Sequence, residues 1–160
     1  MDEVRWLSDQ EQRAWRKLVA VTTLLPAALE CQLQRDADLT LFAYWVLAML
    51  SEAPESSMPM SELADRSTSS PSRLSHVVAK LEQRGWVRRQ QSPVDARVNV
   101  AVLTDAGWTK LAASAPPHVD TVRSLVYDAL TETQVRQLEH ICDSLLLRLD
   151  PRAQVSSLPD

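Results

Sequence analysis

The segment between residues 60 and 103 constrains the fold most strongly, because two short helical patterns joined by a turn are followed there by a strand pattern. Residues 61–66 have helical spacing, and the run STSSPS at 67–72 comes next. Pro71 suits the first position of a second helix, where an N–H would be unpaired anyway, and a serine before it can cap that helix. Gly85 is expected to end this helix, because glycine readily adopts the left-handed backbone found just after a helix.

Two short strands are predicted after the second helix. Residues 86–90 and 99–103 both tend to alternate apolar with polar side chains, and residues 92–97 between them have the composition of a turn-forming loop. A β-hairpin directly after two helices joined by a turn is a wing. The sequence therefore predicts a mainly α-helical protein with a small β-hairpin wing, an α+β fold of the winged helix-turn-helix type.

Helical patterns also precede this unit. A long helix is predicted over 9–35, where apolar residues recur at steps of three and four, and Pro26 should kink it. Residues 40–51 are apolar on almost every side, which indicates a buried core helix with Thr40 as its N-cap. We expect residues 52–59 to form a polar loop.

Further helices are predicted after the hairpin. Thr104 is expected to cap one of them, which Pro116 and Pro117 should break or bend. A final helix is expected to begin with a capping box at 131–134. Its apolar seam steps by three and four positions over two heptads and comprises Val135, Leu138, Cys142, Leu145 and Leu149. Two heptads are too short for a free-standing coiled coil, but they suit a helix packed in a bundle.

The apolar stripes at the two ends of the chain exceed what one small winged domain can cover, so we predict a homodimer. The expected division is an N-terminal dimerisation helix at 1–36, the winged helix-turn-helix at 37–104, C-terminal dimerisation helices at 105–150 and a flexible tail at 151–160. The winged domain is thus expected to lie between helices that hold two protomers together.

Charge is distributed unevenly along the chain. The formal net charge is −4, but residues 60–99 contain seven basic and four acidic side chains, a balance of +3 that leaves −7 for the rest. A compact basic segment in an acidic protein is typical of a localised phosphate-binding face. An ordinary solvated surface can have the same composition, so composition alone leaves both interpretations open.

Several classes of protein lack support in the sequence. The chain has no run of 18 or more apolar residues and no signal-peptide core, so we expect a cytoplasmic protein without a membrane span. The motifs GxxxxGK[ST], GxSxG and HExxH are absent, and neither an enzyme nor a cofactor is predicted. Cys31 and Cys142 form no CxxC pair, which argues against a metal site, and both are expected to be buried as small apolar side chains.

Four fragments occur in an order that resembles the MarR family of bacterial regulators. They are MSELA at 60–64, the segment that begins at Leu74 and ends LEQRGWVRR, DAR at 95–97 and VLTDAG at 102–107. The similarity covers about residues 10–149. It implies a winged helix-turn-helix flanked by dimerisation helices from both chain ends, and a double-stranded DNA partner with a pseudo-palindromic operator.

The resemblance also implies which residues contact DNA. The helix over 71–84 would lie in the major groove, where Arg73 suits a bidentate contact with guanine. In the family the wing arginine enters the minor groove; Arg97 matches that position, and Asp95 can orient its guanidinium. The wing is short and lacks glycine, which departs from the family pattern. The predicted DNA-contacting set is Ser70, Ser72, Arg73, Ser75, His76, Lys80, Arg88, Arg89, Asp95 and Arg97, with Lys80, Arg88 and Arg89 assigned to phosphates.

An effector site is a further implication, because the family binds phenolic effectors where the dimerisation helices meet the winged domain. The expected function is a repressor that a small aromatic effector releases from DNA. The candidate site comprises Trp15, Tyr44, Trp45 and Trp108, together with Phe42; for each of them an ordinary core or interface position is the alternative. The alternative function is a winged-helix protein-interaction module without specific DNA binding. The operator, the effector and the direction of regulation stay open.

Overall fold

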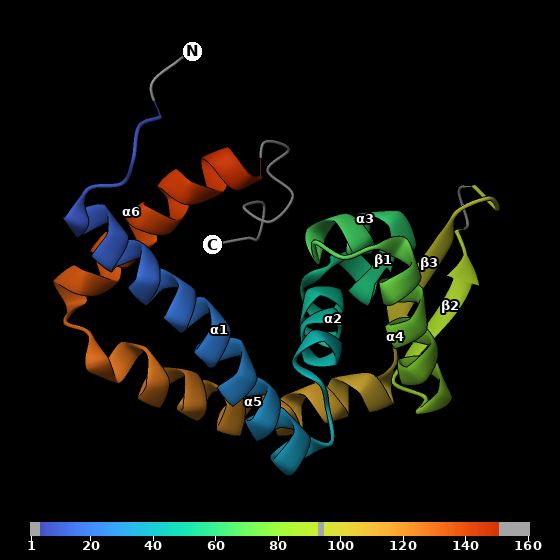
Figure 1. Ribbon diagram of the computed structural model, residues 1–160. Coiled ribbons are helices and arrows are strands. Elements are labelled where there is room, and N and C mark those ends of the chain that lie inside the picture. Colours follow the sequence, from blue (N-terminus) through green and yellow to red (C-terminus); the bar gives the residue numbers. More distant parts are fainter. Residues whose placement is uncertain (1–3, 93–94, 151–160) are drawn as a thin grey trace.

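The structure is a computed structural model that describes residues 4–92 and 95–150, so the predicted tail at 151–160 and part of the hairpin tip lie outside it. Figure 1 shows one body formed by the second, third and fourth helices and the strands, with the long first helix and the last two helices extending away from it. The α-helices are α1 (Asp9–Ala37), α2 (Leu41–Glu52), α3 (Met60–Arg66), α4 (Pro71–Gln83), α5 (Asp105–Leu125) and α6 (Glu132–Leu149). The strands are β1 (Ser57–Pro59), β2 (Val87–Gln91) and β3 (Asn99–Leu103), and the 3₁₀ turns are η1 (Pro54–Ser56) and η2 (Tyr127–Ala129).

The strands form one antiparallel sheet in the order β1-β3-β2, and β2 and β3 are the two strands of the wing. This architecture confirms the predicted winged helix-turn-helix. Strand β1 was not predicted, because its three residues include a proline and show no alternation; they gain strand geometry only by pairing with β3, where Met58 faces Ala101. Strand β2 begins one residue later than expected, since the Trp86 N–H donates to the Leu81 carbonyl at 3.0 Å and so completes the end of α4.

Helix ends follow the local signals in the sequence. The side chains of Thr40, Ser70, Thr104 and Thr131 each accept a hydrogen bond from a backbone N–H in the first turn of the helix they precede, as predicted. Thr131 also forms the predicted capping box with Gln134. Gly85 has a φ of 73° directly after α4, which is the left-handed conformation expected there.

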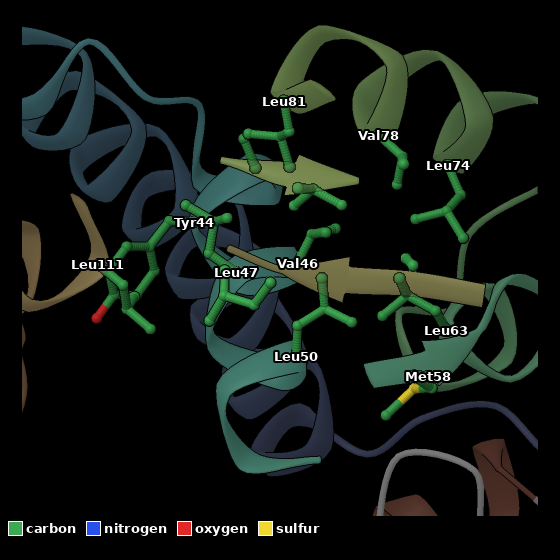
Figure 2. Close-up of a cluster of buried hydrophobic side chains, with 14 of the residues drawn as sticks. Tyr44, Val46, Leu47, Leu50, Met58, Leu63, Leu74, Val78, Leu81 and Leu111 are labelled. Atoms are coloured by element: carbon green, nitrogen blue, oxygen red, sulfur yellow. The ribbon is translucent and has the colours of Figure 1, made fainter. Parts of the chain in front are cut away.

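Helix α2 lies at the centre of the apolar core (Figure 2). Its Val46, Leu47 and Leu50 side chains have no exposed surface. They pack among Leu63 of α3, Leu74 and Val78 of α4, and side chains of the sheet. A helix that is apolar on every side needs neighbours on every side, and α1, α4, α5 and β3 all contact α2. The predicted core helix is confirmed.

The prolines interrupt the helices less than expected. Helix α5 runs without a break through Pro116 and Pro117, so the predicted break before residue 118 is wrong. Each proline removes its own N–H from the ladder and crowds the carbonyl four residues earlier. The helix nevertheless continues, because it packs against α1 and α2 and His118 just after the pair is buried against Gln32. Helix α1 also continues through Pro26, and the kink expected there stays a prediction. No helix within residues 4–92 and 95–150 is long and apolar enough to cross a membrane.

The two ends of the chain leave apolar side chains exposed. Helix α6 buries none of its residues in the single chain, and Leu138 and Leu145 of its seam are 37% and 41% exposed. Cys31 and Cys142 are exposed as well, so the expectation that both are buried is wrong for one protomer. The expectation failed because helical periodicity identifies an apolar face without showing whether the same chain covers it.

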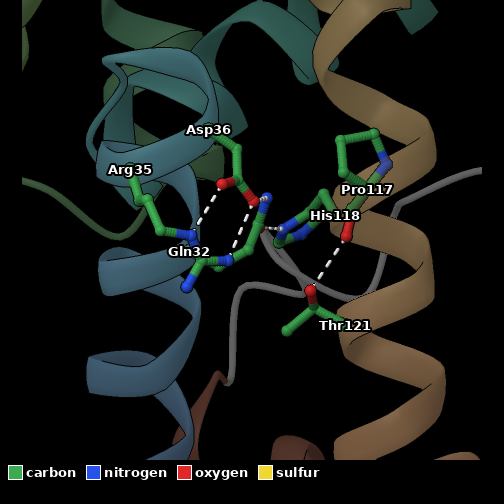
Figure 3. Close-up of polar contacts among 6 residues, drawn as sticks. All are labelled: Gln32, Arg35, Asp36, Pro117, His118 and Thr121. Atoms are coloured by element: carbon green, nitrogen blue, oxygen red, sulfur yellow. Dashed lines mark hydrogen bonds and ion pairs between the residues drawn. The ribbon is translucent and has the colours of Figure 1, made fainter.

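A buried polar cluster joins α1 to α5 (Figure 3). Gln32 and His118 are 3% and 7% exposed, and His118 Nδ1 lies 3.2 Å from Gln32 Oε1. The Gln32 amide donates to Asp36 at 3.1 Å, and Arg35 binds the same carboxylate. Because a carboxylate only accepts, Gln32 presents its oxygen to His118, whose Nδ1 must then carry the proton. The His118 ring also contacts Tyr44 of α2, with centroids 4.4 Å apart, so one imidazole links three helices.

This cluster predicts a pH dependence of stability. Burial lowers the pKa of His118 below its usual range, so the folded state favours the neutral ring. The contribution of neutral His118 to stability is complete above its unfolded pKa of about 6.5. It is lost as the pH falls from there through the lower pKa of the folded state, because the unfolded chain takes up the proton first. We expect the thermal midpoint of the wild type to fall more between pH 7.5 and 5.5 than that of His118→Gln, which keeps an N–H for Gln32 but does not titrate. Parallel decreases in the two proteins would contradict this assignment.

Candidate nucleic-acid interface

Helix α4 presents a polar face to the outside of the winged body. Leu74, Val78 and Leu81 are buried on its inner side, which fixes the rotation of the helix about its own axis. The opposite side therefore carries the residues predicted to contact DNA. Of these, Ser72, Arg73, His76 and Lys80 are exposed, Ser75 is half-buried, and Ser70 caps the helix by accepting from the Arg73 N–H at 3.3 Å.

Serines fix the turn that sets α4 against α3. Ser67 is buried and its hydroxyl donates to the Leu63 carbonyl at 2.6 Å, while the Ser69 N–H donates to the Ala64 carbonyl at 3.0 Å. Between them Thr68 has a positive φ of 47°. The sequence indicated a turn here, but it did not identify Ser67 as a buried residue, because a hydroxyl that binds the end of the preceding helix has no sequence signature of its own.

Arg89 connects the wing to α4. Its guanidinium donates to Glu82 Oε2 at 2.7 and 3.0 Å, and its backbone N–H donates to Oε1 at 3.0 Å. These hydrogen bonds, the side-chain ones first, hold the pKa of Glu82 below its usual range. Arg89 thus has a structural partner that the sequence did not reveal, whereas Arg88 on the same strand is exposed and donates to Gln90.

The wing places Arg97 and Asp95 together. The Arg97 guanidinium donates to both carboxylate oxygens of Asp95 at 3.1 Å, and its backbone N–H donates to Asp95 Oδ1 at 3.0 Å. The side-chain hydrogen bonds from Arg97, followed by the backbone one, lower the pKa of Asp95. The Arg97 side chain is nevertheless 92% exposed, so its cation projects from the hairpin.

Positive charge on this surface is concentrated on α4 and β2. Of the seven cations in residues 60–99, four form ion pairs with carboxylates: Arg66, Arg84, Arg89 and Arg97. The other three, Arg73, Lys80 and Arg88, form no ion pair with any residue that the structure describes. Arg73 instead lies over the ring of Phe42, with Cζ 4.6 Å from the ring centroid. A positive surface without neutralising carboxylates among the described residues therefore remains on the outer side of α4 and β2.

Four of the five aromatic residues predicted for an effector site, Trp15, Tyr44, Trp45 and Trp108, occupy different environments in one chain. Trp15 is 57% exposed on α1, where it lines a cavity of about 330 Å³ with Trp6 and Leu7. Tyr44 is buried against His118. Trp45 is exposed on α2, and Trp108 of α5 donates from Nε1 to the Ser56 hydroxyl at 3.2 Å. A single protomer does not gather Trp15 with the other three.

Comparisons with known proteins identify the family. The sequence model of the MarR family matches residues 39–98. The transcriptional repressor MprA of Escherichia coli (strain K12) is 33% identical over 111 residues, which are 69% of this chain and 62% of that repressor. The chain therefore spans less than two thirds of the length of this relative.

Two solved structures are similar over almost the whole chain. One is Sco3205, a MarR family transcriptional regulator from Streptomyces coelicolor solved in complex with DNA, with 44% identity, a TM-score of 0.90 and 94% of both chains covered. The other is AbsC, a MarR family regulator from the same organism, with 38% identity, a TM-score of 0.87, and 91% of this chain and 98% of that one covered. The chain belongs to the MarR family of transcriptional regulators, as its sequence motifs predicted.

Proposed function

We propose that this protein is a transcriptional regulator that binds a specific sequence of double-stranded DNA. The observation that carries the proposal is the polar outer face of α4, where Arg73 and Lys80 are exposed and no carboxylate among the described residues neutralises them. A helix fits the major groove of B-DNA, and guanidinium groups suit guanine edges there. Phosphates supply much of the affinity through cations, and Lys80 and Arg88 provide these. This uncompensated charge favours DNA over a protein-interaction module.

The active form in this proposal is a homodimer on a pseudo-palindromic operator. The exposed apolar side chains that support it lie on the extended helices away from α4: Trp15, Leu18, Val21, Leu24, Leu138, Ile141, Leu145 and Leu149. A two-fold pair through these helices would leave both recognition helices free, and helix-turn-helix dimers place them about 34–36 Å apart. Exposed apolar surface of this extent on a chain of 160 residues marks an interaction site.

The contacts of individual residues support different proposed roles for them. Ser70, Ser72, Ser75 and His76 are assigned to the base-reading face together with Arg73. Arg97 is assigned to the minor groove, with Asp95 as the group that orients it. Arg89 is assigned first to the link with Glu82, which places β2 against α4, so its phosphate contact would have to be shared with that carboxylate.

We further propose that the regulator is a repressor released by a small aromatic effector. Trp45 and Trp108 are partly exposed on α2 and α5, and Trp15 projects from α1, the helix that a partner protomer would cover. A pocket containing all four aromatics would then depend on the dimer. Selection of bound duplexes from a random pool, with and without candidate aromatic acids, tests the proposal. Binding with no sequence preference would argue for the interaction module instead.

The recognition helix and the wing should respond differently to truncation. Arg73→Ala should weaken binding to the preferred duplex by about 1–3 kcal/mol and relax the preference at one symmetric position of each half-site, because a base contact is lost. Arg97→Ala should weaken binding to many duplexes alike and reduce the salt slope by about one per protomer, because a minor-groove cation is lost. Fluorescence anisotropy at several salt concentrations separates the two effects. If neither variant bound any duplex more weakly than the wild type, the proposed DNA face would be wrong.

A further inference from the structure

Phe42 holds the guanidinium of Arg73 in place without neutralising its charge. Arg73 Cζ lies 4.6 Å from the centroid of the Phe42 ring, and within residues 4–92 and 95–150 the Arg73 side chain forms no ion pair or hydrogen bond. Arg89 and Arg97 differ, because each guanidinium donates from Nε and Nη2 to a carboxylate. Phe42 therefore restrains the cation on the base-reading face of α4 while its charge remains free.

The Phe42 ring that contacts the Arg73 guanidinium is itself held in place by the core. Phe42 stands in the first turn of α2, half-buried and packed against the apolar core, so the ring is fixed to the winged body. An aromatic ring attracts a guanidinium through its quadrupole and offers no lone pair to its N–H groups. A free arginine must lose much of its side-chain freedom when it contacts a base in two places, and a prior restraint lowers that loss.

We propose that Phe42 is a specificity-determining residue, which positions Arg73 for a bidentate contact with a guanine although Phe42 itself does not read the base. The inference rests on the proposed DNA-binding function and goes beyond the contact set predicted from sequence, which assigned Phe42 to an effector site. It also explains why a large aromatic side chain stands only partly covered beside the recognition helix.

The test compares Phe42→Leu and Phe42→Tyr with the wild type on two duplexes, the preferred one and the same duplex with the Arg73-dependent base pair changed in both half-sites. Phe42→Leu should weaken binding to the preferred duplex about tenfold for a dimer that carries two such contacts, and leave the altered duplex within about twofold. Phe42→Tyr keeps the ring and should retain the wild-type preference. In an Arg73→Ala background, Phe42→Leu should have no further effect on either duplex.

The outcomes separate the inference from the function on which it rests. If Phe42→Leu weakened both duplexes equally, or weakened binding in the Arg73→Ala background as much as in the wild type, Phe42 would be only a packing residue and the inference would be overturned. An unchanged preference in Phe42→Leu would overturn it as well. A wild-type protein that selects no duplex would instead refute the proposed function, and the role of Phe42 with it. Thermal unfolding of each variant confirms that folded proteins are being compared.

Discussion

Leu138→Asp combined with Leu145→Asp should convert the protein from a dimer to a monomer at micromolar concentration. Both side chains lie in the seam of α6, more than a third exposed in one chain, and α6 buries no residue against its own protomer. Two carboxylates would have to be desolvated in the interface that we propose for this seam, at a cost of several kcal/mol. Affinity for the full operator should therefore fall at least a hundredfold, because a monomer reaches only one half-site.

A control with the same change in charge distinguishes the seam from general electrostatics. Thr133→Asp combined with His140→Asp also adds two carboxylates to α6, on the side of the helix away from the seam. That variant should remain dimeric by light scattering and keep its affinity within about threefold. A seam variant that is still a dimer would place the interface elsewhere, for instance on α1 alone.

Gly107→Ala should lower the free energy of unfolding by about 3 kcal/mol, through overpacking against rigid backbone. Gly107 is buried in the first turn of α5, and a Cβ added there would collide with the Trp86 carbonyl oxygen and lie 2.6 Å from Leu103 Cδ1. The Trp86 carbonyl is not free to move away, since it accepts a hydrogen bond from the Thr104 N–H at 3.1 Å. Urea denaturation followed by circular dichroism measures the change.

Gly85, the other glycine of the chain, is the matched control for this substitution. Gly85 has a positive φ of 73°, but an added Cβ would meet no atom within 4 Å. Gly85→Ala should therefore cost only the strain of a left-handed alanine, about 1 kcal/mol. Equal losses in the two variants would show that backbone conformation, rather than the close approach of α5 to Trp86, explains why glycine is needed at position 107.

The parts of the fold that sequence could predict are those decided within a few residues. The caps at Thr40, Ser70, Thr104 and Thr131 depend on hydrogen bonds to the next turn, so a short motif is sufficient. The central place of α2 followed from its composition alone. Strand β1 was beyond this kind of reasoning, because its geometry depends on a partner strand more than forty residues later.

The same distinction holds in the candidate site. The outer face of α4 was predictable from the apolar residues on its inner face. The partners of the arginines at this site were not predictable. Glu82 lies on α4 and its partner Arg89 on β2, while Phe42 lies on α2 and Arg73 on α4. A charge count along the sequence therefore gives the net balance of this segment but does not show which cations are free, because it does not show which already have a carboxylate.

Helix α5 connects the winged body to the extended helices of the molecule. Its first turn is anchored to the winged body, because the Thr104 N–H donates to the Trp86 carbonyl and the Thr104 hydroxyl donates to the Gly85 carbonyl. Its later turns pass the buried Gln32–His118 contact with α1 (Figures 1 and 3). With 21 residues and no internal loop, the helix is about 31 Å long. The contact with α1 at His118 lies about 20 Å from the first turn, so a rotation of about 10° there would move the first turn by about 3.4 Å, the rise per base along a DNA strand. In the proposed dimer on DNA, such a rotation where α1 meets α5 would shift α4 by about one base pair relative to its two-fold mate.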